Sequence, residues 1–460
     1  LQKLLSALYS TRLMALLFIG FAAAMAAGTF IEDAYNTETA RILVYNTWWF
    51  EAIMVFFVIN FFGNIKRYQL YKKEKWATLL LHLSFIFIII GAFVTRYISY
   101  EGLMPIREGA ISNTVYSDMP HLTTFVDGEY QGEMKRKTIE NQLLLSQAVN
   151  NSFSYSDKFS DIPYKIELQE FIMNASQTFK PNAKGDLYIK LVEASGGSRK
   201  EHFLRDGEVK NISNVLFAFN KFTQGAVNIS KIAEAYTIQT PFDGNFMRMA
   251  DKFQGTISKD KASPLMFRSL YNAGGSQFVF PELAQNGEVV LASNNDYKDK
   301  KTDDAIVVKV TSQNKEEIVT LMGSKGKQGE PKSFKIGKLD FTLMYGSKVH
   351  TLPFSIKLND FVAEKYPGTE KSYSAFKSKI EIQDKEKSKT FTDSVFMNHI
   401  LDYREFRFFQ ASFDEDEKGT VLSVNHDFWG TWITYLGYFL LYFALMAILF
   451  DKNTRFNDLK

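Results

Sequence analysis

A single histidine interrupts an otherwise apolar stretch of the sequence. His82 is the one ionisable side chain between Trp76 and Thr95, a run of about 20 residues that is long enough to cross a bilayer as a helix. An ionisable group at membrane depth is costly, and it usually faces the interior of a helix bundle and has a function there. The imidazole could be a packing contact with a neighbouring helix, a proton relay or a ligand of haem iron.

The bulk composition limits the classes of function. The 460 residues carry a formal net charge of +3, which gives no reason to expect nucleic-acid binding, and their length allows two or three domains. The sequence contains no cysteine, so the chain cannot form disulfides, use a thiol nucleophile or bind haem covalently through its own thiols. The apolar residues are concentrated in a few long runs, as is typical of a membrane protein with a large soluble part.

Four of these runs are long enough to span a membrane. Three lie at about 13–31, 48–65 and 76–97, within a membrane region of residues 1–98, and the fourth begins at Phe428 within residues 428–460. Gly20, Ala24 and Gly28 recur every four residues in the first span. Such a stripe of small residues lets a second helix approach closely, although chance in an Ala-rich helix explains it almost as well.

The charges between the spans predict the orientation of the chain. Basic residues lie between the second and third spans and after the fourth, whereas the first connection is acidic; the basic residues are Lys66, Arg67, Lys72, Lys73, Lys75, Lys452, Arg455 and Lys460. Because Lys and Arg are enriched in cytoplasmic loops, we expect both termini in the cytoplasm and residues 99–427 outside. His82 would then lie roughly 9 Å inside the cytoplasmic edge of a hydrocarbon core about 30 Å thick.

Residues 99–427 are expected to form a mostly β, antiparallel domain. Polar and apolar residues alternate in segments such as 164–168, 187–191, 354–358 and 376–382, and a period of two is typical of half-buried strands. Asp-Gly and Asn-Gly dipeptides between such segments predict tight turns. The pattern indicates a sandwich or barrel, with a loop-rich stretch from Gly255 to Asp304 as the connection between two subdomains.

The other histidines form no catalytic pattern. His121, His202, His350, His399 and His426 lack a paired spacing such as His-x-x-x-His. We interpret each as a surface or packing residue and predict no catalytic residue. His426 is the least ordinary of them, because it lies where the fourth span meets the outer face.

Together, these features resemble ResB, also called CcsB, the smaller half of the System II cytochrome c synthetase. The resemblance covers essentially the whole chain, and three segments carry it. They are Gly28-Thr-Phe-Ile-Glu-Asp33 with Tyr45-Asn-Thr-Trp-Trp-Phe50, the His82 helix, and Met397-Asn-His-Ile-Leu-Asp-Tyr-Arg-Glu-Phe-Arg-Phe-Phe-Gln-Ala-Ser-Phe413 with Gly419-Thr-Val-Leu-Ser-Val-Asn425.

The resemblance implies a multi-pass protein of the bacterial inner membrane that acts in cytochrome c biogenesis. In this family, ResB works with CcsA, also called ResC, as a separate subunit or a fused part. The pair moves haem b outwards and attaches it to the Cys-x-x-Cys-His motif of apocytochrome c. His82 matches the family's axial ligand of the haem iron, and the second ligand is expected from CcsA.

The attachment step is not expected in this chain. The family's attachment signature, Trp-Gly-x-x-Trp-x-Trp-Asp, belongs to CcsA, and the lookalike Trp429-Gly-Thr-Trp432 lacks its closing Trp-Asp. Trp429 and Trp432 are better explained as aromatic residues at the membrane interface. We therefore expect the chain to be the non-attaching half of the synthetase, and favour a piece of a fused polypeptide.

Several supporting roles follow from the resemblance. Lys66, Arg67 and Lys75 are candidates to pair with the haem propionates, although the ordinary bias of cytoplasmic loops explains them better. Thr78 and Ser84 are candidates to orient the His82 ring. The outer domain is expected to dock CcsA, the apocytochrome or thiol-reducing proteins.

Two alternatives from other classes remain open. The chain could be a scaffold that stabilises CcsA without touching haem, or a membrane-anchored sensor whose outer domain binds an external ligand. Both predict that His82 is dispensable. A proton-coupled transporter is disfavoured, because no second carboxylate or histidine accompanies His82 deep inside the membrane.

Overall fold

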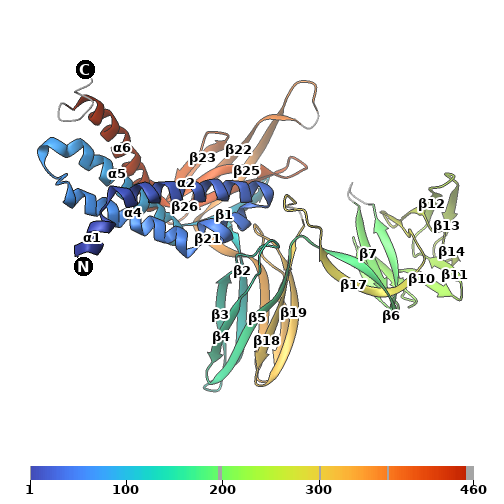
Figure 1. The fold of residues 1–460 in the computed structure, drawn as a ribbon. Helices are drawn as coiled ribbons and strands as arrows, with labels where there is room; N and C mark the ends of the chain where they lie inside the picture. Colours follow the sequence, from blue (N-terminus) through green and yellow to red (C-terminus); the bar gives the residue numbers. More distant parts are fainter. Residues whose placement is uncertain (1, 195–198, 300–301, 370–371, 452–460) are drawn as a thin grey trace. The chain divides into compact units, whose positions relative to one another are not determined.

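The computed structural model describes residues 2–194, 199–299, 302–369 and 372–451; the basic residues after position 451 lie outside this range. The chain divides into two compact units (Figure 1). The first consists of Leu1–Met173 and Asp296–Lys460, and the second of Asn174–Asn295. The helices belong to the first unit, together with a large part of the β structure.

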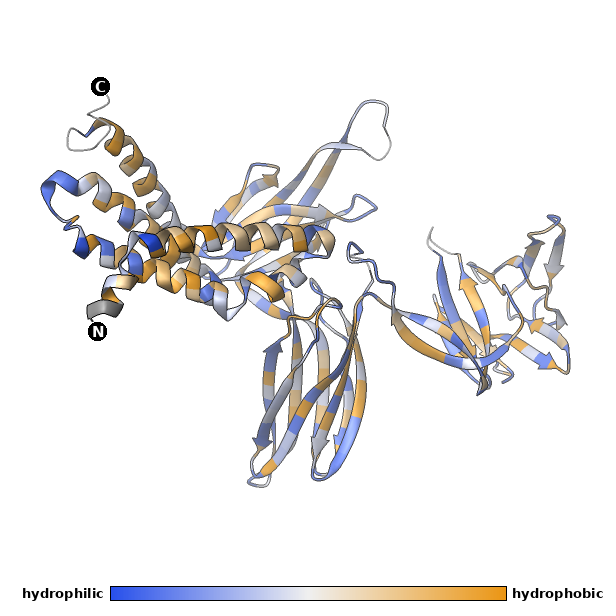
Figure 2. Cartoon of the chain, in the orientation of Figure 1, coloured by the Kyte–Doolittle hydropathy of each residue, from blue (hydrophilic) through white to orange (hydrophobic). Residues whose placement is uncertain are grey.

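Four helices of the described residues are long and apolar enough to cross a membrane, which confirms the predicted multi-pass architecture. In Figure 2 these helices carry mostly the colour of hydrophobic residues. The helices are α1 (Gln2–Leu8), α2 (Thr11–Ala34), α3 (Thr37–Ala40), α4 (Trp48–Arg67), α5 (Trp76–Tyr97) and α6 (Phe428–Phe450), with a π-helical turn at Arg41–Tyr45 and a 3-10 turn at Lys73–Lys75. Ser10 and Thr47 cap α2 and α4, because their hydroxyls accept the backbone N–H groups of Leu13 and Phe50.

Helices α5 and α6 approach each other closely at glycines. A Cβ atom at Gly91 of α5 would collide with Thr434, and one at Gly437 of α6 would lie 2.7 Å from Ile88 Cγ1. The stripe predicted on α2 behaves differently. A Cβ at Gly20 would meet only Ile53, at 3.8 Å, and Gly28 faces the ring of Tyr45. The close helix contact is therefore made by α5 and α6.

The β structure of the first unit has two sheets in its described residues, and all their strand pairs are antiparallel. The ten-stranded sheet runs in the order β23 (Lys389–Phe396), β22 (Tyr373–Asp384), β21 (Leu339–Lys365), β2 (Ile111–Tyr130), β1 (Tyr100–Arg107), β26 (Gly419–His426), β25 (Phe406–Phe413) and β24 (Leu401–Tyr403), with β20 (Lys332–Ile336) on β21 and β3 (Glu133–Gln142) on β2. The four-stranded sheet is β19 (Lys315–Gly323), β18 (Asp304–Ser312), β5 (Ile162–Ile172) and β4 (Ser154–Phe159).

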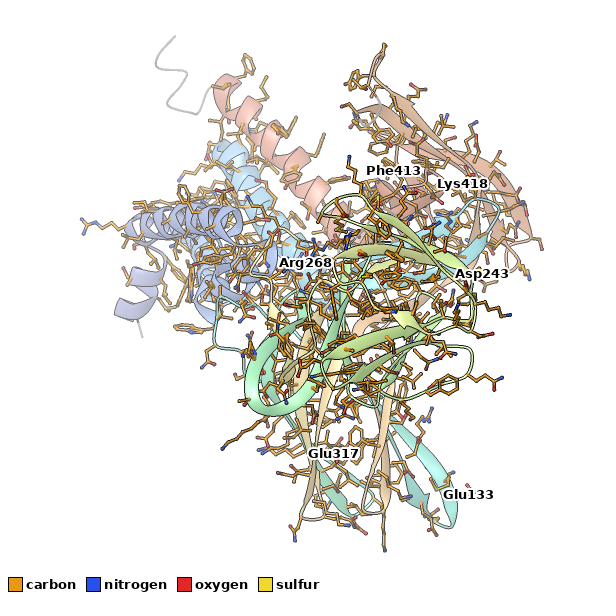
Figure 3. The ribbon with its side chains drawn as sticks, turned by 90° about the vertical axis from the view of Figure 1, so that its right-hand side faces the viewer. Glu133, Asp243, Arg268, Glu317, Phe413 and Lys418 are labelled. Carbon is orange, nitrogen blue, oxygen red and sulfur yellow. The ribbon has the colours of Figure 1, made fainter. Side chains whose placement is uncertain are left out.

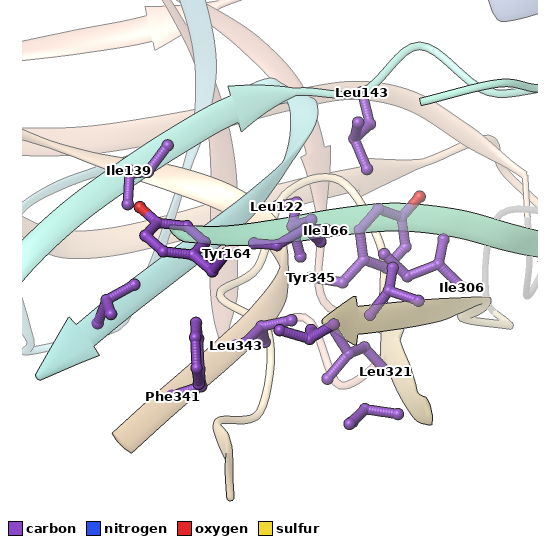
Figure 4. Close-up of a cluster of buried hydrophobic side chains, with 14 of the residues drawn as sticks. Leu122, Ile139, Leu143, Tyr164, Ile166, Ile306, Leu321, Phe341, Leu343 and Tyr345 are labelled. Atoms are coloured by element: carbon purple, nitrogen blue, oxygen red, sulfur yellow. The ribbon is translucent and has the colours of Figure 1, made fainter. Parts of the chain in front are cut away.

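The sheets of the first unit enclose two hydrophobic cores. One core lies between the four-stranded sheet and the facing parts of β2, β3, β20 and β21, and includes Leu122, Ile166 and Phe341 (Figure 4). The other includes Met104, Phe354 and Phe408, and it is enclosed because β23 returns to lie beside β24 and β25. The unit thus combines a sandwich with a curled sheet, in agreement with the predicted class. Figure 3 shows charged side chains such as Glu133 and Glu317 on its strands.

The second unit is built from shorter strands around Phe217, Tyr271 and Phe278. One sheet is β13 (Gln254–Ile257), β12 (Gly244–Arg248), β15 (Ser269–Ala273), β16 (Ser276–Val279), β6 (Ala175–Glu193) and β17 (Gln285–Ser293), with β7 (Lys200–Arg205) on β6; the other is β14 (Ser263–Pro264), β11 (Ala235–Gln239), β10 (Val227–Ile232), β9 (Val215–Phe219) and β8 (Val209–Ile212).

The stretch from Gly255 to Asp304 contains more strand than predicted, although the chain does pass between the two units within it, at Asn295 and Asp296. Strands β13 to β17 occupy much of it, and Gly274 and Gly275 form the turn of the β15–β16 hairpin, with φ angles of +64° and +77°. Such angles suit glycine, since it has no Cβ. The strands were missed because they are only two to nine residues long and their turns are rich in Lys and Asp.

Candidate functional site

The structure places His82 two turns into α5, with its ring partly buried. Its Nδ1 atom lies 2.9 Å from the backbone oxygen of Thr78. A carbonyl oxygen can only accept a hydrogen bond, so Nδ1 carries the proton. The lone pair is then on Nε2, which is the tautomer that a metal ligand needs, with its ring orientation held by the other nitrogen.

Of the two residues expected to orient the His82 ring, one contacts it and the other does not. Thr78 contacts the ring, but through its backbone oxygen rather than its hydroxyl. Ser84 does not take part, because its hydroxyl donates to the backbone oxygen of Leu81 at 2.7 Å. Two positions along a helix correspond to about 200° of rotation, so Ser84 lies on the far side of α5, where its backbone oxygen faces Gly437 of α6.

One aromatic ring contacts the imidazole, and further rings stack behind it. The Phe61 ring of α4 meets His82 edge-on, with a centroid distance of 5.7 Å. Phe61 is itself stacked on Phe85 at 5.3 Å and on Phe57 at 5.9 Å, and Phe18 of α2 packs against Phe57 at 4.8 Å. Three helices therefore contribute to one aromatic cluster, and His82 lies at its Phe61 side.

An apolar groove of about 900 Å³ begins beside these rings. Its lining comes from four helices and includes Phe18, Met25, Met54, Phe61, Phe85, Ile89, Phe93 and Tyr438. Along α5, Phe85, Ile89 and Phe93 follow His82 at spacings of three and four residues, so all four lie on one face of the helix. His82 itself does not line the groove, but it lies next to the lining residue Phe61 and on the same face of α5 as Phe85.

An ion pair lies at one end of the groove. Arg96 Nη2 is 2.6 Å from Glu51 Oε1, and the Tyr97 hydroxyl donates to the same oxygen at 2.8 Å. Glu51 is therefore paired at the edge of its span. These three side chains make this end of the groove polar. The rest of the lining is hydrocarbon, aromatic ring or thioether, apart from the hydroxyl of Tyr438.

Of the three basic candidates for pairing with the haem propionates, two donate hydrogen bonds to backbone carbonyl oxygens. Arg67 Nη1 donates to the carbonyl oxygens of Ser6 and Tyr9, at 3.3 and 3.2 Å, and Lys75 Nζ donates to that of Tyr68 at 2.6 Å. Lys66 is exposed. Lys66 is therefore the member of this group that is best placed to meet an incoming anion.

Two asparagines inside α4 were not singled out in the sequence. Asn60 Nδ2 donates to the backbone oxygens of Leu8 and Ser10, at 2.6 and 3.0 Å, and Asn64 Nδ2 donates to Asn60 Oδ1 at 2.6 Å. Both side chains are buried. Their spacing of four residues within an apolar run is a signal that could have identified them, and their role is to fasten the α1–α2 turn to α4.

The histidines outside the spans fall into two groups. His202 lies 3.3 Å from Glu193, and His399 is stacked on Phe396, as expected for packing or surface residues. His350 and His426 both stack on Tyr100, with His121 nearby on β2. Among the described residues, no group of three or more His, Asp or Glu side chains is arranged to hold a metal ion.

Comparison with known proteins gives two matches. Residues 329–434 match the ResB-like family, and the chain is 26% identical over 459 residues to Protein NrfI of Wolinella succinogenes. The C-terminal part of the chain is thus similar to the ResB-like family. This match covers the strands from β20 to β26 and the start of α6. All of the chain takes part in the similarity to NrfI, but it spans only 36% of that protein's length.

Proposed function

We propose that this chain belongs to the ResB-like family and acts in cytochrome c biogenesis as the haem-holding part of a bacterial inner-membrane complex. The observation that carries the proposal is the His82 ring, which lies next to an aromatic groove inside a membrane span. Its Nδ1 bonds to a backbone oxygen, and its Nε2 has no hydrogen bond to any residue that the structure describes. The match to the ResB-like family supports the role in cytochrome c biogenesis.

The chemistry of haem b suits these surroundings. The porphyrin ring is flat and apolar, so the stacked rings of Phe57, Phe61 and Phe85 and the groove beyond them offer a matching surface. A neutral imidazole nitrogen supplies one axial ligand to the iron. The propionates need a cation or water, and exposed Lys66 near the start of α5 is our candidate.

The remaining parts of the complex follow from the same proposal. Both termini would be cytoplasmic, with the β units on the outer side. The second axial ligand and the attachment to apocytochrome c would come from a CcsA-like part. Ligand exchange at iron would then release the haem from His82.

The test is the visible spectrum of the chain purified together with its CcsA-like part, as wild type and as His82→Ala. We expect a Soret band that weakens or disappears in the variant and returns when imidazole is added. Ser84→Ala is the matched control, since Ser84 lies on the same helix but faces α6, and it should leave the spectrum unchanged. Equal haem content in wild type and His82→Ala would refute the ligand role and favour a scaffold.

A further inference from the structure

A cavity of about 300 Å³ lies between the β24–β25 hairpin and the start of α6. It shares no lining residue with the apolar groove of the helices. Strand β26 ends at His426 and α6 begins at Phe428, so the cavity stands where the sheet meets the last membrane span. Its lining includes Glu405, Arg407 and Phe409 from the hairpin and Asp427, Thr431 and Trp432 from the start of α6.

The alternation of side chains along β25 separates the cavity from the protein core. Phe406 and Phe408 belong to the core of the ten-stranded sheet. Arg407 and Phe409 lie on the opposite face, because successive side chains of a strand alternate. Helix α6 is close to that face, since Arg407 Nη1 donates to the Tyr435 hydroxyl at 3.2 Å. The cavity is therefore the space between the outer face of the hairpin and the helix.

The two guanidinium groups of the lining are already neutralised. Arg407 forms a bidentate pair with Asp402, at 2.7 and 2.9 Å. Arg404 pairs with the buried Asp384 at 3.1 Å and with Glu386 at 2.7 Å. A simple anion would have to compete with these carboxylates, so the cavity suits such a ligand poorly.

Two carboxylates of the lining have no such cation. Among the described residues, the one ion pair of Glu405 is a 3.9 Å approach to His426 Nε2, which is charged only when protonated. Asp427 Oδ2 accepts the hydroxyls of Thr95 and Thr431, at 2.6 and 3.5 Å, whereas its buried Oδ1 has no hydrogen-bond partner in the described part of the chain. The cavity therefore has excess negative charge, which acts strongly on a cation beside the low dielectric of a membrane.

The hairpin turn fixes one of these carboxylates at the cavity. Tyr403 pairs with Phe406, so Arg404 and Glu405 form a two-residue turn, with φ angles of +50° and +71°. Asn-Gly is the sequence that suits such a turn best. The ion pairs of Arg404 explain its presence there, but Glu405 has no comparable partner and its side chain is 53% exposed. Glu405 is thus available to a ligand.

The helix side of the cavity supplies a hydrogen-bond donor and exposed rings. The Tyr435 hydroxyl accepts from Arg407, and no described residue accepts its own proton, so it can also donate. Tyr435 and Trp432 are exposed, with ring centroids 6.2 Å apart. Exposed Trp and Tyr residues at the end of a span are typical of the headgroup level of a membrane. The cavity therefore offers carboxylates on one side and a hydroxyl donor on the other, at the depth of lipid headgroups.

We propose that this cavity binds the headgroup of a phosphatidylethanolamine-type lipid. The primary ammonium group donates to Glu405, in the field of Asp427. The phosphodiester accepts the proton of Tyr435, and the acyl chains follow the exposed apolar side chains of α6. An anionic headgroup fits less well, because it lacks the ammonium group that neutralises the two carboxylates. A lipid is favoured over a lysine of a partner protein because the cavity lies beside the exposed Trp432. This inference does not rest on the binding of haem.

The experiment is a lipid titration of the purified full chain in detergent, followed by native mass spectrometry. The probes are dioleoyl phosphatidylethanolamine and dioleoyl phosphatidylcholine, which share acyl chains and phosphate but differ in the N–H donors of the headgroup. We expect the wild type to bind the ethanolamine lipid about tenfold more tightly, as one charge-assisted hydrogen bond allows, and Glu405→Gln to lose this preference. Glu317→Gln is the matched control, because it removes the same charge from an exposed position of β19 and should keep the preference.

A second variant tests the other half of the headgroup. Tyr435→Phe keeps the ring but removes the hydroxyl, so it should weaken both lipids and leave the preference between them. Retained binding of the choline lipid by Glu405→Gln would show that the cavity is still formed. The proposal is overturned if the wild type shows no preference, or if Glu405→Gln keeps it, in which case a lysine of a protein partner becomes the better occupant. Neither result would affect the role proposed for His82.

Discussion

The contact between α5 and α6 gives the sharpest prediction of stability, through the substitution Gly91→Ala. The new Cβ would overlap Thr434 Oγ1 and would lie 2.9 Å from the Thr434 nitrogen and 3.0 Å from the Gly430 oxygen. A side-chain hydroxyl can rotate away, but the two backbone atoms can move only if the helices separate. Inserting a methyl group into such a contact typically costs about 1–3 kcal/mol.

Gly20→Ala in α2 is the matched control. There the nearest atom to the new Cβ is Ile53 Cδ1, at 3.8 Å, which is an ordinary van der Waals contact. Both substitutions gain the same helix propensity, about 1 kcal/mol. The difference between them therefore isolates the collision, and we expect Gly91→Ala to be less stable than Gly20→Ala by about 1–3 kcal/mol.

The assay is unfolding of the two purified variants in the same detergent, followed by tryptophan fluorescence. A second readout is the haem content of each variant purified with its CcsA-like part, since displaced α5 would also move His82. Equal stability of Gly91→Ala and Gly20→Ala would refute the close approach of α5 and α6 on which the reasoning depends.

Two further predictions concern the β structure. Phe278 is fully buried in the second unit, whereas Phe222 of the same unit is 71% exposed. Phe278→Ala should therefore destabilise that unit by about 3–5 kcal/mol, and Phe222→Ala by about 0.5 kcal/mol or less. Similar denaturation midpoints for the two variants would contradict the assigned core. In the first unit, burial of Glu38 opposes ionisation, but the hydrogen bond and charge of Lys325, 2.5 Å away, lower the pKa of Glu38 below its ordinary value of 4.5. A lowered folded-state pKa gives stability that is present above pH 4.5 and is lost as the pH falls through the folded value. Lys325→Met should therefore flatten the acid limb of a stability-against-pH curve, and an unchanged limb would argue against the pair.

The membrane helices and several strands could be predicted from local patterns. An apolar run of membrane length has few other solutions in a folded chain, so the His82 helix was expected close to its observed bounds. The alternating segments 164–168, 187–191, 354–358 and 376–382 all lie within strands, in β5, β6, β21 and β22.

The arrangement of residues distant in sequence could not be predicted in this way. Tyr100, His350 and His426 meet because β1 pairs with β26 and β2 pairs with β21, and no local signal specifies these pairings. The stripe of small residues shows the same limit. Gly20 and Gly91 look equivalent in sequence, but only Gly91 has a helix packed directly against it.

The junction between helices and sheet has a mechanical consequence. Helix α5 leads into β1 and β26 leads into α6, and the two strands are hydrogen-bonded along their whole length, from Tyr100 with His426 to Arg107 with Gly419. The two helices also approach closely at Gly91 and Gly437, so α5, β1, β26 and α6 are joined by both a strand ladder and a helix contact. A rotation of the β1–β26 pair would therefore be transmitted to α5, the helix that carries His82.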